Sequence, residues 1–214
     1  MYKKLIVIGL LFSLALPAMA FWPLSSKQKL KVAADTWIYQ FKPDKNYGNG
    51  WGWADITDPT KSVTVPKMFL GFGGADKKII LLKFDLSALK KNKGIKKAEV
   101  AIYNDFAGSA MAIKVDARKV ISSWEEMGVT YNKKPQTTEK ILSSTVFQGA
   151  IDFAQKGKWY KFDVTPAVQS WQKGEPNYGI MLDPEGDAGV DFDIIAREYS
   201  DKASYVPVLE VQYQ

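Results

Sequence analysis

A glycine-rich segment at residues 47–53, Tyr-Gly-Asn-Gly-Trp-Gly-Trp, carries three aromatic side chains. Trp51 and Trp53 are two positions apart, so they point to the same side if the segment is extended. The C–H faces of sugar rings pack on such rings, and their hydroxyl groups need polar partners. Glycine on both sides favours an exposed loop. The segment predicts a sugar platform of Tyr47, Trp51 and Trp53; the alternative is that one or both indoles cover an open edge of the fold.

Basic side chains form a second candidate binding surface. Lys114, Asp116 and Arg118 alternate with apolar residues, which places all three on one face of a regular strand. An arginine on such a face can hold a carboxylate with two parallel hydrogen bonds. Arg197 is a further candidate. The alternative for all three cations is an ion pair within the protein or a solvated surface. For Arg197 the ion pair is favoured, because acidic residues are near it in the sequence: Asp191, Asp193 and Glu198.

Acidic residues at alternate positions raise the question of calcium. The segment 183–187, Asp-Pro-Glu-Gly-Asp, is followed by Asp191 and Asp193. Calcium takes oxygen ligands from such loops, but the spacing lacks the EF-hand register, and an acidic hairpin tip is the commoner explanation. Asp35 and Asp85 could belong to a different structural calcium site, which the sequence leaves open. No other cofactor is indicated.

The absence of two residue types removes much enzyme chemistry. The chain has no histidine and no cysteine, which excludes Ser-His-Asp and Cys-His nucleophiles, zinc sites with those ligands, and disulfides. Carboxylates such as Asp105, Glu125 and Glu126 are scattered and select no catalytic pair. Polysaccharide lyases can work with Tyr, Lys and Arg, so a small lyase or hydrolase stays an alternative. We predict that the chain is not an enzyme.

The first 20 residues resemble an export signal. Lys3 and Lys4 precede the apolar run 5–16, and Ala18-Met19-Ala20 gives a small-x-small cleavage pattern. The run is shorter than a membrane span, so we expect no membrane span in the mature chain. The predicted location is outside the cytoplasm: extracellular, on the cell surface or in a periplasm. The formal net charge is +6, without a run of five or six like charges, which argues against a nucleic-acid partner.

The secondary structure around these residues is predicted to be mostly β-strand. Alternating or apolar β-formers recur with turn residues between them, at residues 30–39, 63–72, 79–84, 98–103, 112–120, 159–164, 179–182, 192–196 and 208–213. No long helical pattern follows the strands regularly, which favours an all-β sandwich with short helical turns in its loops. Thr165, Pro166 and Gly174 bound one such helix. Ser123 and Glu126 have the spacing of a capping box.

Two tryptophans and two pairs of similar short segments give predictions about the structure of the loops. Trp124 and Trp171 are expected to anchor loops on the core rather than to contact a ligand. The segments 83–87 and 161–165 echo each other, as do 46–48 and 177–179, although their order is reversed between the two halves. In the first pair, we expect Asp85 and Asp163 to lie beside the backbone amides of the turn that follows.

The order of the landmarks resembles the DNRLRE domain, also called carbohydrate-binding module family 96. The resemblance rests on these segments: 34–36, 46–48, 83–87, 97–103, 124–125, 129–132 with Pro135, 162–165 with Trp171, 177–180, 196–198 and 207–209. It implies a jelly-roll β-sandwich at residues 32–214, after the leader at 1–20 and a linker at 21–31. It also implies a secreted protein, with binding of acidic polysaccharides such as alginate in some members. The extra length between Tyr47 and Met68 departs from the family pattern.

These observations give one leading hypothesis and two alternatives. The leading one is a secreted, non-catalytic carbohydrate-binding module for an acidic polysaccharide, which uses aromatic stacking and contacts from Lys and Arg. The first alternative is a structural or adhesive surface protein that binds another protein and no sugar. The second is a small polysaccharide lyase or hydrolase.

Overall fold

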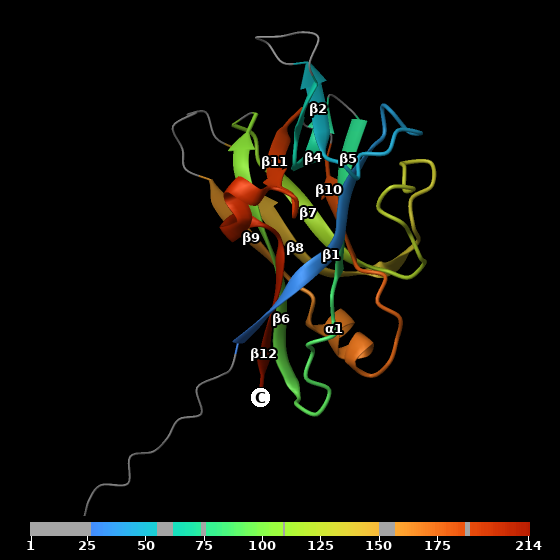
Figure 1. Cartoon of the computed structure of the whole chain (residues 1–214), viewed down its shortest axis with the longest axis vertical. Coiled ribbons are helices and arrows are strands. Elements are labelled where there is room, and N and C mark those ends of the chain that lie inside the picture. The colour runs from blue at the N-terminus through green and yellow to red at the C-terminus, as the bar shows by residue number, and fades with distance from the viewer. Residues whose placement is uncertain (1–26, 55–61, 74–75, 109, 150–156, 187–188) are drawn as a thin grey trace, which may run out of the picture.

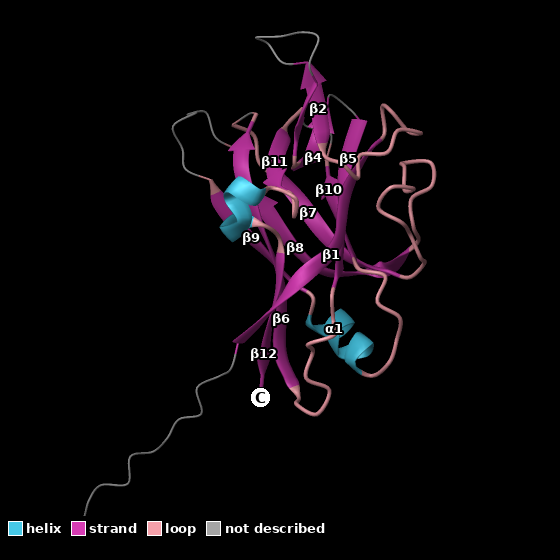
Figure 2. Cartoon of the chain, viewed as in Figure 1, coloured by secondary structure: helices cyan, strands magenta, loops and turns pink. Residues whose placement is uncertain are grey.

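The computed structural model describes residues 27–214 except 55–61, 74–75, 109, 150–156 and 187–188; of 51–54, 62–65 and 73 it describes the backbone only (Figure 1). Its elements are β1 (Lys27–Tyr39), β2 (Trp51–Ala54), β3 (Ser62–Val65), β4 (Lys67–Gly73), β5 (Asp76–Phe84), β6 (Ile95–Ala107), β7 (Ile113–Val120), β8 (Thr137–Phe147), β9 (Lys158–Asp163), α1 (Thr165–Gln172), β10 (Ile180–Glu185), β11 (Asp191–Ile195), the 3-10 turn η1 (Ser200–Tyr205) and β12 (Val208–Tyr213). Strands dominate (Figure 2), so the predicted all-β class is confirmed.

Ten of these strands form one hydrogen-bonded network. The strand order is β1-β12-β6-β11-β4-β5-β10-β7-β8, with β9 paired to β6. A further pairing of β1 with β5 closes six of the strands into a ring. The separate pair β2-β3 joins Trp51 to Val65 and Trp53 to Val63. All these pairings are antiparallel. A jelly-roll sandwich in the strict sense stays a prediction.

Strand β1 closes the ring because it changes partner along its length. Its first residues pair with β12, and after an irregularity between Val32 and Ala34 its second half pairs with β5. Residues 35–38 are all buried, which is the pattern of a strand covered on both faces. This burial takes the carboxyl group of Asp35 out of water.

The core has two parts, one on each side of β5. The main cluster contains Trp37, Phe72 and Phe192, and the smaller one contains Ile79, Leu81, Met181 and Trp124. Trp124 is buried in the smaller cluster, and its indole N–H donates to the carbonyl of Tyr178 at 2.7 Å. Trp171 is buried in the main cluster. The prediction that both tryptophans anchor loops is confirmed.

The two sequence echoes mark matching turns. The carboxylates of Asp85 and Asp163 each accept a hydrogen bond at 2.9 Å from the amide two residues later, as predicted. In the other pair, the side-chain oxygens of Asn46 and Asn177 each accept the amide of a glycine two residues later at 3.0 Å. Such local bonds are how Asx residues fix a turn.

Two predicted helix caps are wrong in detail. Helix α1 begins at Thr165, with Val164 at the cap, because the Thr165 hydroxyl instead accepts the amide of Ala98 at 2.8 Å. The helix ends before Gly174, whose φ is +105°, as predicted. The segment 123–126 forms no helix, since the Glu126 carboxylate binds Arg197 instead. Among the described residues, no helix is long and apolar enough to cross a membrane.

Candidate functional site: a basic groove beside strand β7

A groove of about 280 Å³ lies where β5, β7 and β10 meet the loop that joins β7 to β8. The strands contribute Lys77, Ile79, Arg118, Met181 and Asp183, and the loop with the start of β8 contributes Tyr131, Lys134, Pro135, Thr137, Thr138 and Glu139. The loop is held in place by the buried indole of Trp124 and by a hydrogen bond of 2.9 Å from the Ile121 amide to the Gln136 carbonyl. We call this the basic groove.

Arg118, which lines the basic groove, is held by two partners. Its guanidinium donates to the carbonyl of Glu139 at 2.7 Å and lies 3.6 Å from the carboxylate of Asp116. Asp116 is fully buried; burial raises its pKa, but hydrogen bonds from Ser144 and Lys114 outweigh this, and the pKa lies below its usual value. The guanidinium has five N–H donors, so it keeps donors for a ligand. Lys114, Asp116 and Arg118 share one face of β7, as the alternation predicts.

Two lysines and a tyrosine complete the basic groove. The Lys134 ammonium lies 4.1 Å from the centre of the Tyr131 ring, and within the described part of the chain it makes no ion pair. Lys77 is paired with Asp183 at 3.2 Å. Lys134 is therefore the cation in the groove that is most available to an anion.

Lys114 lies outside the basic groove, although it is on the same strand face. It is exposed and pairs with Glu185 at 3.0 Å and with Asp116 at 3.3 Å. Lys114 therefore forms ion pairs within the protein, as in the alternative interpretation of this cation. Its structural effect is to help keep Asp116 ionised beside Arg118.

Tyr47 is part of the core. Its side chain is 3% exposed, and its ring stacks on that of Trp37 with centroids 4.0 Å apart. The adjacent Asn46 amide group donates to the carbonyls of Glu126 and Val129, each at 2.7 Å, which pulls the turn onto the protein. Tyr47 therefore offers no exposed ring, and the echo with 177–179 was the sequence signal that this segment is a structural turn.

Trp51 and Trp53 lie on one short strand, β2, so the extended backbone assumed for them is confirmed. Their side chains are outside the described residues, and the sugar platform at these two positions stays a prediction.

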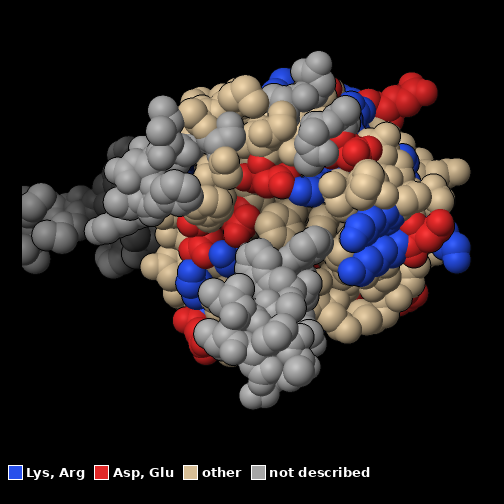
Figure 3. Space-filling view, turned by 90° about the horizontal axis from the view of Figure 1, so that it is seen from above, with Lys and Arg blue, Asp and Glu red and all other residues tan. Residues whose placement is uncertain are grey.

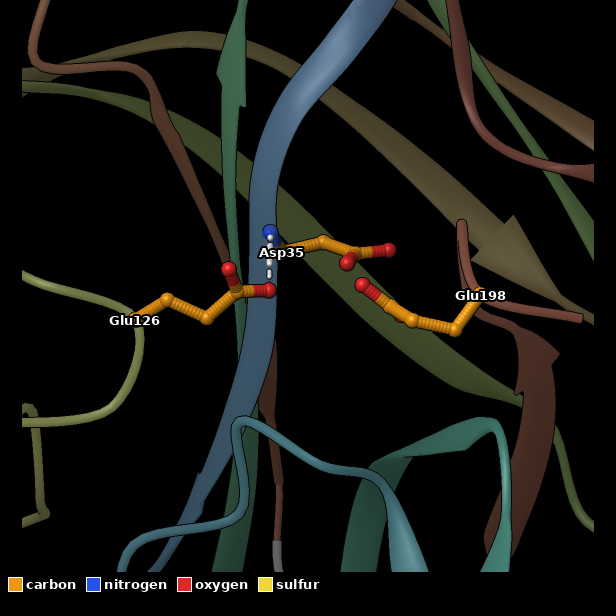
Figure 4. Close-up of side chains that lie close together, drawn as sticks. All are labelled: Asp35, Glu126 and Glu198. Atoms are coloured by element: carbon orange, nitrogen blue, oxygen red, sulfur yellow. Dashed lines mark hydrogen bonds between the residues drawn. The ribbon is translucent and has the colours of Figure 1, made fainter.

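Arg197 pairs with the carboxylates of Asp35, Glu126 and Glu198, and Figure 4 shows these three acidic side chains close together. Its guanidinium is 2.7 Å from Glu126, 2.7 Å from Glu198 and 3.3 Å from Asp35. The favoured ion-pair interpretation of Arg197 is confirmed, although two of the three partners come from distant segments. Asp191 and Asp193, the other partners expected, pair with Lys78 and Lys67.

The electrostatics of this cluster are set by burial. Asp35 is 2% exposed; burial, together with the charges of Glu198 and Glu126, raises its pKa to about 7. Burial also raises the pKa of Glu198. One oxygen from each of the three carboxylates lies within 4.8 Å of the others, a spacing that suits a metal ion. The Arg197 guanidinium already supplies a cation at this place, so we describe the cluster as an ion-pair network.

The carboxylates that suggested a calcium site form ion pairs with lysines. Asp183, Asp191 and Asp193 pair with Lys77, Lys78 and Lys67, respectively, while residues 187–188 are outside the described part. Asp85 is engaged with the amide of Ser87 and does not join the Asp35 cluster.

Comparison with known proteins gives a family and distant relatives. The tRNA nuclease WapA of Bacillus subtilis (strain 168) is 27% identical over 164 residues, and the tRNA3(Ser)-specific nuclease WapA of Bacillus spizizenii is 26% identical over the same length. The alignments cover 73% of this chain but only 6% of each relative, so the chain spans a small part of those proteins. The family described as carbohydrate-binding module family 96 matches residues 26–213, nearly the whole chain; the chain belongs to carbohydrate-binding module family 96.

Proposed function

We propose that this chain is an exported, non-catalytic module that binds an acidic polysaccharide in the basic groove. Family membership supports carbohydrate binding. The observation that carries the acidic specificity is the composition of the groove, which is lined by three cations, Lys77, Arg118 and Lys134, together with Tyr131, against two carboxylates, those of Glu139 and Asp183.

The chemistry of a uronate sugar fits this arrangement. Its carboxylate needs a cation, and Lys134 and Arg118 have capacity left for one. The C–H face of the sugar ring needs an aromatic or apolar surface, which Tyr131 provides. Trp51 and Trp53 are proposed as a further stacking surface.

A non-catalytic role is supported by the state of Asp183, which lines the groove together with Glu139, and of Asp116, which pairs with Arg118 but does not line the groove. Asp183 is paired with Lys77, and Asp116 is buried under Lys114 and Arg118. A general acid needs a raised pKa and a general base must reach substrate, whereas Asp116 has a lowered pKa and no exposure. The nuclease activity in the names of the WapA relatives belongs to proteins of which this chain spans 6%.

Removing the charge of Lys134 tests the proposal. We expect Lys134→Ala to weaken binding to sodium alginate about fivefold, since it removes one cation contact of roughly 1 kcal/mol. Isothermal titration and affinity gel electrophoresis, with hydroxyethylcellulose as the neutral polymer, measure this. The matched control is Lys93→Ala, which removes the same charge from the exposed loop between β5 and β6. Equal loss in both variants would mean that only net charge matters.

Arg118 is best tested by a conservative change. Arg118→Lys keeps the charge that Asp116 needs but loses the planar pair of donors. We expect alginate affinity to fall about threefold, with a thermal midpoint close to that of the unchanged protein. A fall in thermal midpoint without any change in affinity would assign Arg118 a purely structural role.

Salt provides an independent prediction. Raising the ionic strength from about 0.05 M to about 0.5 M shortens the Debye length severalfold, so alginate binding should weaken markedly. The loss caused by Lys134→Ala should shrink at the same time, because the contact it removes is then screened. A salt-independent affinity for alginate would contradict the proposal that cations select the ligand.

A further inference from the structure

Three aromatic rings gather on a surface formed by β6, β9 and η1, and no residue of this surface lines the basic groove. The ring of Trp159 lies 5.4 Å from that of Tyr103 and 6.4 Å from that of Tyr205, between centroids. The rings of Tyr103 and Tyr205 are 4.3 Å apart. On adjacent strands, Tyr103 is directly opposite Trp159. We call these three residues the aromatic patch.

The exposure of Trp159 is unusual in this protein. The structure describes the side chains of four tryptophans, and three of them, Trp37, Trp124 and Trp171, are buried. Trp159 is 37% exposed and its neighbour Tyr205 is 38% exposed. Single exposed apolar residues are ordinary, whereas exposed rings that lie together form a candidate interaction surface. Trp159 and Tyr205 also lie nearly parallel, with 28° between their planes.

Charged groups border the aromatic patch and are held rigidly. Asp105 stands two residues after Tyr103 in β6 and is paired with Lys202 at 2.6 Å and with Lys67 at 2.8 Å. Burial raises the pKa of Asp105, but the hydrogen bonds from Lys202 and Lys67 outweigh this and keep the pKa below its usual value. An ionised acceptor and an ammonium donor therefore lie beside the rings. The space-filling view from above shows acidic and basic side chains side by side on the molecular surface (Figure 3).

We propose that the aromatic patch is a second sugar subsite, which stacks the apolar face of a pyranose ring of a polysaccharide on Trp159 and Tyr205. The inference rests on the proposed function, because the pyranose is chosen as the occupant from the carbohydrate-binding family of the chain. Exposed rings bordered by a few fixed polar groups are the arrangement that sugar hydroxyls and C–H faces require. The subsite recognises no charge, so it binds the sugar backbone of neutral and acidic polymers alike.

Two subsites that share no residue have a consequence for avidity. A long polymer that reaches both the basic groove and the aromatic patch is held by two contacts on one protein molecule. The second contact is then intramolecular, and it raises the overall affinity. A short oligosaccharide fills one subsite at a time. The unchanged protein should therefore prefer long alginate to a trisaccharide, and loss of the aromatic patch should reduce that preference.

The test uses full-length variants with sodium alginate and hydroxyethylcellulose. We expect Trp159→Ala to weaken binding to both polymers about tenfold, equally at low and high salt. Trp159→Phe, which keeps a ring, should retain most of the affinity. Tyr205→Ala, from a different element, should repeat the loss if Trp159→Ala folds poorly. Thermal melting checks the fold of each variant.

The outcomes separate this inference from the proposed function. If the unchanged protein binds alginate while Trp159→Ala and Tyr205→Ala bind it equally well, the aromatic patch is not a subsite and the basic groove stands. If the unchanged protein binds neither polymer, both proposals fall. If sedimentation shows that Trp159→Ala converts a dimer into a monomer, the rings bind a second copy of the chain, and the sugar subsite is refuted.

Discussion

Replacing Gly179 with alanine should destabilise the protein by about 3 kcal/mol or more, which is at or beyond the upper end of the usual range for a single substitution. Gly179 has φ of +95°, and a Cβ atom there would lie 2.1 Å from the carbonyl oxygen of Leu82. That oxygen belongs to β5, at the centre of the strand network, where the next residue, Ile180, pairs with Leu82. The backbone cannot move away without breaking this pairing. Urea denaturation measures the loss.

A second glycine separates the two causes of this loss. Gly174 also has a positive φ, +105°, but a Cβ atom there would meet nothing within 4 Å. Gly174→Ala should therefore cost only the backbone penalty, about 1 kcal/mol. Similar losses in the two variants would show that the contact with Leu82 relaxes easily, and the account of this strand junction would be wrong.

The stability of the protein should carry a pH-dependent component from Asp35 that is opposite to that of an ordinary aspartate. Burial holds the pKa of Asp35 at about 7 in the folded state, against 3.8 for an unperturbed group. Folding therefore takes up a proton between these values. The contribution of Asp35 is fully present below about pH 4 and is lost as the pH rises to 7, by an amount on the order of 4 kcal/mol.

The variant Asp35→Asn isolates this component. Other carboxyl groups, such as Asp105 and Asp116, have lowered pKa values and act in the opposite direction. The pH profile of stability of the unchanged protein therefore combines both kinds of contribution. The free energy of unfolding of the unchanged protein minus that of Asp35→Asn should fall steadily from pH 5 to pH 7 and then level off. A difference that is constant, or that rises with pH, would mean that Asp35 is ionised throughout.

Local sequence patterns were sufficient for the all-β class and for several turns. The carboxylates of Asp85 and Asp163 each accept a hydrogen bond from the amide two residues later, so both contacts are local in the sequence. Gly174 ends α1 because its own backbone conformation suits glycine. Trp124 could be assigned to the core because a large ring beside a short turn usually covers apolar surface. Each of these predictions depends on neighbours in the sequence.

The candidate site depended on contacts between distant segments. The basic groove joins Lys77, Arg118, Lys134 and Asp183. Of its cations only Arg118 was singled out from the sequence, and Asp183 was considered there as a calcium ligand instead. Lys134 lies in a loop with no periodicity, so no local pattern distinguished it. The Glu126 carboxylate was assigned to a cap, but Arg197, 71 residues away, provides a stronger partner. Strand pairing decides such contacts, and one sequence does not give the pairing.

The exposure of two aromatic residues, Tyr47 and Trp159, was also decided by contacts that the sequence does not give. Tyr47 stands in a glycine-rich segment typical of an exposed loop, yet the hydrogen bonds of Asn46 pull it into the core against Trp37. Trp159 alternates with Tyr160 along β9, and the alternation alone does not say which of the two faces water. The register with β6 decides it, because Trp159 falls opposite Tyr103 on the outer face.

A heteronuclear NMR titration of the protein with a short oligouronate at low salt tests the proposed binding in the basic groove most directly. The amide resonances that shift most should belong to Arg118, Tyr131, Lys134 and residues 137–139, which line the basic groove. Shifts confined to any other surface, or no shifts at millimolar oligouronate, would contradict binding in the basic groove.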